Sequence, residues 1–196
     1  MLYTRLLILT ALMAAGCTTP GPTPHADAGF QYLETTGAAI VALDPLPLRV
    51  EAHGFRATPV VNRAATFGEH PFEVSLAALL QGGEAVLVHA ERVADASGAS
   101  NYDSLPQARW PDSRFRLRTQ CVAVDAATAG QEHDLAFLRG QGWNPEGQLA
   151  LEQYLATTPD HNREVVVSLV THVSDCARSD EVQAALDRLR AKVSVH

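Results

Sequence analysis

The sequence has 196 residues, 46% of them hydrophobic and 19% charged, and its formal charge at neutral pH is -7. A chain of this length can bury the core of one globular domain. The acidic balance argues against a nucleic-acid partner or binding to anionic lipid, because proteins of those classes carry a broad excess of positive charge.

The first 17 residues have the layout of a secretion signal. The charged Arg5 precedes a largely apolar run from Leu6 to Ala15, and small residues lead from there to Cys17. This run is shorter than the roughly 20 apolar residues that a membrane-spanning helix needs. The stretch Ala14-Ala15-Gly16-Cys17 resembles the lipobox of bacterial lipoproteins, with Ala14 where leucine is usual.

The resemblance implies that residues 1–16 are a removed signal peptide and that Cys17 carries palmitate or similar acyl chains as a membrane anchor. Each buried methylene contributes about 0.8 kcal/mol, so several chains hold a protein permanently. In the sorting rule of these lipoproteins, Thr18 after the cysteine favours the outer membrane, with the domain facing the periplasm. The alternative is an ordinary signal peptide with a chance cysteine near its cleavage site.

The next residues predict a tether and then one domain. Residues 17–29 contain Pro20, Pro22 and Pro24, a spacing typical of an extended linker. Residues 30–196 are the size of a single domain.

Alternation of apolar and polar residues predicts strands through the first two thirds of the domain. The Gly82-Gly83 turn indicates a β-hairpin between two of them. The predicted strands are AAIVAL (38–43), LPLRVEAHGF (46–55), FEVSLAAL (72–79) and EAVLVHAERVAD (84–95).

The segment FRLRTQCVAV (115–124) is also predicted to be a strand. Alternation directs Phe115, Leu117, Thr119 and Cys121 to the inner face. The opposite, solvent face carries Arg114, Arg116, Arg118 and Gln120.

The pattern then changes towards helices. Helices are predicted over 131–140, over 144–158 with Asn144 as N-cap, and over 179–193. The β-branched segment 163–176 is predicted to be a central strand buried on both faces. The expected fold class is α+β, a mainly antiparallel sheet of about five to six strands with two to three helices, mostly in the C-terminal third.

Two cysteines remain after Cys17. In an oxidising periplasm, Cys121 and Cys176 are most simply a disulfide bond, which here would join the strands 115–124 and 163–176. The alternative is a pair of buried free thiols.

The three arginines have two interpretations. They pair with acids of the same sheet, for which Glu51, Glu73, Glu91 and Glu164 are the candidates, or they form an anion site. In the second case the partner is an acidic protein face or an envelope glycan carrying carboxylate or phosphate.

Catalytic and metal motifs are absent from the sequence. There is no G-x-S-x-G elbow and no C-x-x-C, so we predict no catalytic residue, no metal and no cofactor. Polar residues of a possible metal site are scattered without ligand spacing, and with 22 acids no carboxylate pair stands out. The scattered residues are His89, Glu91, His133, Asp134, His161 and His172.

Loops offer two further binding candidates. Trp110 and Trp143 lie beside prolines in turns, where a tryptophan either fixes a loop to the core or anchors a partner. The loop 97–103 is either a binding loop or an ordinary connection.

We therefore expect an outer-membrane lipoprotein facing the periplasm that acts as a non-enzymatic binding module. Its partner would be an envelope protein or a cell-wall component, as for an assembly accessory or an inhibitor. The alternative is a periplasmic hydrolase that acts on cell-wall glycan or peptide.

Overall fold

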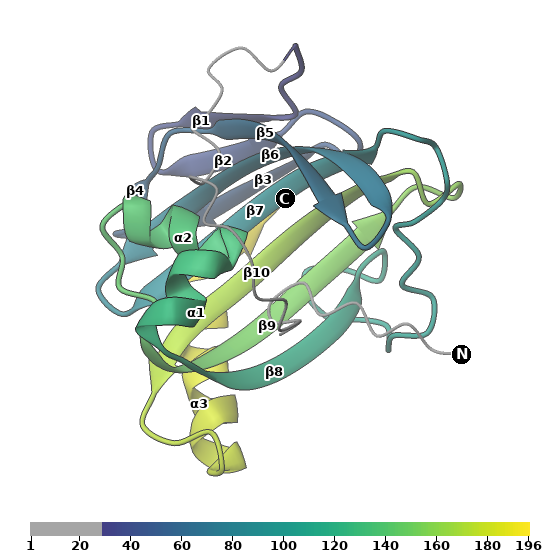
Figure 1. Ribbon diagram of the computed structural model, residues 1–196. Coiled ribbons are helices and arrows are strands. Elements are labelled where there is room, and N and C mark those ends of the chain that lie inside the picture. Colours follow the sequence, from purple (N-terminus) through teal and green to yellow (C-terminus); the bar gives the residue numbers. More distant parts are fainter. Residues whose placement is uncertain (1–28) are drawn as a thin grey trace.

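The computed structural model describes residues 29–196 (Figure 1). The predicted signal peptide, the acylation of Cys17 and almost all of the predicted tether lie outside the described residues. In chain order, the strands are β1 (Leu33–Thr36), β2 (Ala39–Ala42), β3 (Leu48–Ala52), β4 (Arg56–Ala57), β5 (Val61–Phe67), β6 (His70–Gln81), β7 (Glu84–Val93), β8 (Arg116–Val124), β9 (Gly147–Thr157), β10 (Arg163–Val173) and β11 (Val193–Val195). The helices are α1 (Ala126–Gln131), α2 (His133–Gly140) and α3 (Ser179–Arg190).

A seven-stranded antiparallel sheet organises the domain. Its order is β4-β6-β7-β10-β9-β8, and β5 pairs with β6 beside β4. The predicted hairpin is confirmed, since β6 and β7 pair from Phe72 opposite Val93 to Gln81 opposite Glu84. Gly82 adopts a positive φ of 53° in the turn, a conformation that glycine reaches without strain. Strand β10 is central and buried on both faces along most of its length, as its β-branched sequence predicts.

A second sheet of four strands, in the order β1-β2-β3-β11, packs on one face of the larger sheet. Alternate residues of β6, β7, β9 and β10 form one half of this core, and the small sheet supplies the other half. The small sheet contributes Leu33, Ile40, Ala42, Leu48, Val50, Ala52 and Val193.

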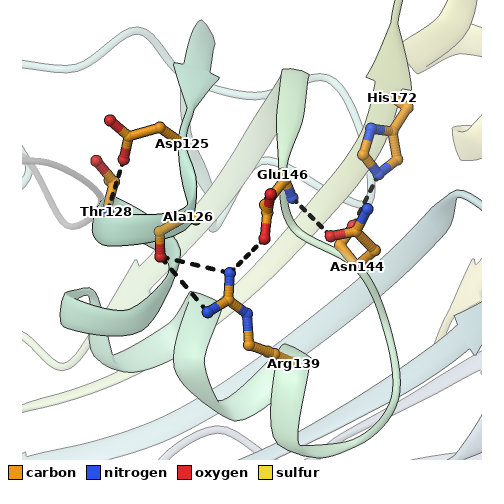
Figure 2. Close-up of polar contacts among 7 residues, drawn as sticks. All are labelled: Asp125, Ala126, Thr128, Arg139, Asn144, Glu146 and His172. Carbon is orange, nitrogen blue, oxygen red and sulfur yellow. Dashed lines mark hydrogen bonds and ion pairs between the residues drawn. The ribbon is translucent and has the colours of Figure 1, made fainter.

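Helices α1 and α2 cover one end of the opposite face of the large sheet (Figure 1). Leu135 and Leu138 of α2 are buried there against apolar residues of β6, β7, β9 and β10. Asp125 caps α1 by accepting the Thr128 N–H at 2.7 Å. Arg139 of α2 then reaches back to the Ala126 carbonyl and donates to Glu146 at 2.7 Å, which ties both helices to the start of β9 (Figure 2).

Helix α3 packs against β9 and β10 on the other side of the sheet. Its Arg190 donates two hydrogen bonds to the buried Glu152, which also accepts one from Tyr154 at 2.6 Å. A disulfide bond joins Cys121 to Cys176, confirming that prediction. Cys176 lies in the turn between β10 and α3, and not in the strand as expected.

The predicted helix over 144–158 is wrong, because this segment forms β9. Leu149, Leu151 and Leu155 fit a strand as well as a helix, and cross-strand pairing with both β8 and β10 decides between the two. Asn144 does not cap a helix. Its side chain accepts the Glu146 N–H at 3.1 Å, a local turn, while its carbonyl accepts a hydrogen bond from His172 (Figure 2).

The α+β class with a mainly antiparallel sheet and three helices agrees with the sequence, but the described residues form eleven strands where about five to six were expected. The additional strands are β9, the seven-residue β5, and three elements of two to four residues, β1, β4 and β11, which are too short for an alternating pattern to reveal. Strand β4 has two residues and β11 has three, and both depend on partners far away in sequence.

Candidate functional site

Polar side chains gather in the middle of the sheet face that α1 and α2 cover only in part. Residues opposite one another on paired strands share a face, so the strand register brings these positions together. We call the set the charged face. Its members are Arg63 of β5, His89 and Glu91 of β7, Arg118 of β8, Gln153 of β9, and Glu164 and Ser168 of β10.

A chain of ionic contacts links this face to α2. Arg63 donates to Asp134 at 3.0 Å, and Asp134 lies 3.4 Å from Nε2 of His89. Nδ1 of the same imidazole lies 2.7 Å from Glu91. His89 and Glu91 are buried, with 5% and 1% of their surfaces exposed. Both imidazole nitrogens therefore face a carboxylate.

This environment favours the imidazolium form of His89. Burial alone lowers the pKa of His89, but the charge of Asp134 and the hydrogen bond to Glu91 outweigh burial and raise the pKa. Arg63 opposes the rise more weakly. The positive and negative groups thus alternate from Arg63 through Asp134 and His89 to Glu91.

Glu164 lies directly opposite Glu91, on the neighbouring strand β10. It is also 1% exposed. Side chains opposite one another in an antiparallel pair have Cβ atoms about 4.5–5.5 Å apart. The fold thus selects one pair of buried carboxylates among the acids of the chain.

Arg118 extends the charged face towards the edge of the sheet. Its guanidinium lies 5.9 Å from the centre of the Tyr102 ring, and the negative charge of Glu164 acts on it. Burial lowers the pKa of Arg118 from its usual value. Its Nη1 and the Oε1 of the adjacent Gln153 are buried polar atoms without a hydrogen-bond partner. Such atoms are uncommon in folded proteins, where buried polar groups nearly always have a hydrogen-bond partner.

A small pocket of about 200 Å³ opens beside this end of the sheet. Arg114, Arg116 and His161 line it together with Asp103 and Thr157. Arg114 is engaged by Asp112, to which it donates several hydrogen bonds of 2.8–3.2 Å. Arg116 makes only long contacts, 3.4 Å to the Leu105 carbonyl and 3.8 Å to Asp103.

The arginines do not share a solvent face as predicted. Arg114 precedes β8 and is exposed, whereas Arg118 of the charged face is half-buried, as is Arg116, which lies on the same side of the sheet. Because β8 is an edge strand, its other face is only partly covered, and Thr119 is exposed where the alternation predicts burial. Arg114 pairs with Asp112 and Arg116 lies 3.8 Å from Asp103, neither of which is among the expected glutamates, whereas the charge of Glu164 acts on Arg118.

The two tryptophans hold loops to the core. Trp110 is half-buried and packs edge-on against Tyr154 at 4.7 Å, and Trp143 is 4% exposed with its ring 5.1 Å from that of His172. Trp143 therefore offers almost no surface to a partner.

Of the residues considered for a metal site, the fold brings together His89, Glu91 and Asp134. Across residues 29–196, no group of three or more such side chains is placed to hold a metal ion, because these three bind one another. Sequence reasoning missed Arg63 and Gln153. The available signal was the break in the apolar alternation of β7, where His89 and Glu91 follow Leu87 on a buried face.

Comparison of the chain with protein families, curated proteins and solved structures found no match. Within residues 29–196, no helix has the length and apolar character needed to cross a membrane.

Proposed function

We propose that the protein is a lipoprotein of the outer membrane, anchored through Cys17, whose domain faces the periplasm and binds an envelope component without catalysing a reaction. The signal resemblance at Ala14-Ala15-Gly16-Cys17 supports the anchor. The disulfide supports an oxidising compartment, because such bonds form and persist there.

The observation that carries the binding role is the state of Arg116 in its pocket. A guanidinium has five N–H donors in a planar fork, and the contacts of Arg116 are both long. The group can therefore form short bonds to an added carboxylate or phosphate, with His161 on the pocket wall as a further donor.

The size of the pocket limits what it can receive. Pockets for drug-sized ligands are about 300–1,000 Å³, whereas this one is about 200 Å³. A single anionic group attached to a larger partner fits this space. The chain as a whole is negatively charged, whereas two arginines line the pocket. This contrast favours binding of a specific anion over general binding to polyanions.

Anchoring is tested by replacing Cys17 with Ser and fractionating cells. We expect the wild-type protein in the outer-membrane fraction with an acylated N-terminus by intact-mass analysis, and the variant without acyl chains. An unlipidated wild-type protein would contradict the proposal.

Binding is tested by photo-crosslinking in intact cells from a probe residue at Ser113, which lines the pocket. We expect one dominant crosslinked partner that is lost in Arg116→Gln. The matched control is Arg49→Gln, since Arg49 is exposed to a similar extent but lies on the small sheet beside Glu51. If Arg116→Gln leaves the crosslinking unchanged, the pocket is not the binding site.

The Glu91 and Glu164 pair supports a second candidate, the periplasmic hydrolase. Retaining glycosidases need two carboxyl groups about 5 Å apart. Glu91 and Glu164 occupy facing positions on adjacent strands, but each exposes only 1% of its surface, so this activity also requires the face to open to a glycan. The purified protein would then release soluble fragments from cell-wall glycan, and Glu91→Gln and Glu164→Gln would each abolish that release. Such a result would replace the binding proposal.

A further inference from the structure

Strand β8 forms one edge of the seven-stranded sheet and is only partly covered on its outer side (Figure 1). The preceding loop pairs with its beginning: Ala108 N–H donates to the Phe115 carbonyl at 2.8 Å, and Leu117 N–H donates to the Pro106 carbonyl at 2.9 Å. The backbone groups of odd-numbered residues therefore point away from β9. Hydrogen-bonding directions alternate along a strand, so Thr119, Cys121 and Ala123 point outward in the same way.

No described backbone group pairs with the outward N–H and C=O groups of these three residues. Thr119 and Ala123 are exposed and Cys121 is half-buried. The register of β8 with β9 continues from Arg116 to Val124 without interruption. This edge is therefore regular over about five residues, the usual length of a strand.

The opposite edge of the sheet is built differently. It is divided between β4 and β5, with Pro59 between them, and interruptions of this kind discourage the addition of another strand. On β8, by contrast, the disulfide at Cys121 ties the middle of the strand to the turn before α3. A fixed, regular edge loses little conformational freedom when a further strand is added.

Charge favours an acidic partner. Of the three arginines, Arg114 is bound by Asp112, and Arg116 lies opposite Gln107 of the preceding loop. Arg118 is half-buried and borders the free part of the edge. An added strand with an acidic residue opposite Arg118 would place a carboxylate beside this guanidinium.

Two copies of this chain are a poor match for the same edge. Antiparallel pairing of two β8 strands centred on Cys121 would place Arg118 of each copy opposite Val124 of the other, so neither copy supplies a carboxylate to that guanidinium. Residues 18–28 of the chain itself contain one acid, Asp27, and so lack the alternating charge.

We propose that the edge of β8 from Thr119 to Ala123 binds an extended, acidic segment of a partner polypeptide as an additional strand. The main-chain hydrogen bonds supply affinity, and Arg118 supplies the preference for an acidic side chain. This inference rests on the strand edge and stands without the anion pocket of the proposed function.

The test uses the full lipidated protein in detergent and a blocked heptapeptide, acetyl-Thr-Glu-Val-Glu-Val-Glu-Thr-amide, with the corresponding lysine peptide as charge control. The measurement is amide hydrogen exchange by NMR. At a peptide concentration ten times the dissociation constant, we expect exchange at Thr119, Cys121 and Ala123 to slow by about tenfold, since protection scales with occupancy. The lysine peptide should leave it unchanged.

Thr119→Pro removes one outward N–H without removing a hydrogen bond to β9, and we expect it to weaken peptide binding. Ala123→Pro provides the same test if the first variant does not fold. Arg118→Gln should abolish the preference for glutamate over lysine and retain backbone protection.

Three results would overturn the inference. The first is unchanged exchange at Thr119 and Ala123 at peptide concentrations of about 10 mM, beyond which binding is negligible. The second is equal protection by both peptides. The third is protection that rises with protein concentration when no peptide is added. Inorganic phosphate separates this inference from the proposed function, because it should shift resonances of Arg116 and His161 and leave exchange at Ala123 unchanged.

Discussion

Glu91 and Glu164 face each other across strands β7 and β10, and each exposes about 1% of its surface. Two carboxylates in such a position repel each other unless cations balance them. His89 lies 2.7 Å from Glu91, and Arg118 acts on Glu164 from the other side. The charged face is thus a balanced arrangement whose stability depends on the protonation of one imidazole.

The stability of the fold should therefore fall as the pH rises above about 6.5, the usual pKa of histidine in an unfolded chain. The pKa of His89 is raised in the folded state, so its contribution is fully present below the unfolded pKa and is lost as the pH passes through the folded pKa. Between these values, the free energy of unfolding should decrease by up to about 1.4 kcal/mol per pH unit.

Urea denaturation at a series of pH values measures this slope. His89→Gln should remove it, whereas His53→Gln, which changes an exposed histidine in the turn after β3, should retain it. An identical slope in wild type and His89→Gln would show that another group is responsible.

The disulfide should make a large contribution to stability. It closes a loop of 55 residues, for which the chain-entropy model gives on the order of 4 kcal/mol. We expect Cys121→Ser with Cys176→Ser to lower the free energy of unfolding by about this amount. Reducing agent should lower the urea midpoint of the wild type and leave that of the double variant unchanged. A reductant effect on the double variant would point to a different cause.

The sequence is sufficient to predict those features that are local or repeat with a short period. The β6 and β7 hairpin follows from alternation and from Gly82-Gly83, and α3 follows from the spacing of Val182, Leu186 and Leu189. The strand β9 was missed because its leucines satisfy both periods, and only pairing with β8 and β10 removes the ambiguity.

The candidate site depends still more on distant contacts. His89 and Glu91 are two residues apart on one strand, so their shared face can be predicted. Asp134 comes from a helix more than 40 residues later, and Glu164 becomes a neighbour only through the register of β10. The spacing of these residues in the sequence does not show that Asp134 and Glu164 lie beside His89 and Glu91. For the same reason, the sequence placed Arg118 on a solvent face, whereas the loop carrying Tyr102 covers it.

Replacement by Met should cost much more stability at Arg190 than at Arg118. Arg190 donates two hydrogen bonds to Glu152, a carboxylate that is 3% exposed. Arg190→Met leaves that buried charge without its cation, and we expect the free energy of unfolding to fall by about 3 kcal/mol.

Arg118 is half-buried, and its Nη1 has no hydrogen-bond partner. Arg118→Met relieves the cost of desolvating this guanidinium and retains its packing on Tyr102. We expect a change within about 1 kcal/mol, of either sign. Urea denaturation of both variants at one pH compares them directly, and Arg49→Met is a control for the loss of an exposed ion pair. If Arg118→Met costs as much as Arg190→Met, then Arg118 is a structural residue of the charged face and is not held in reserve for a ligand.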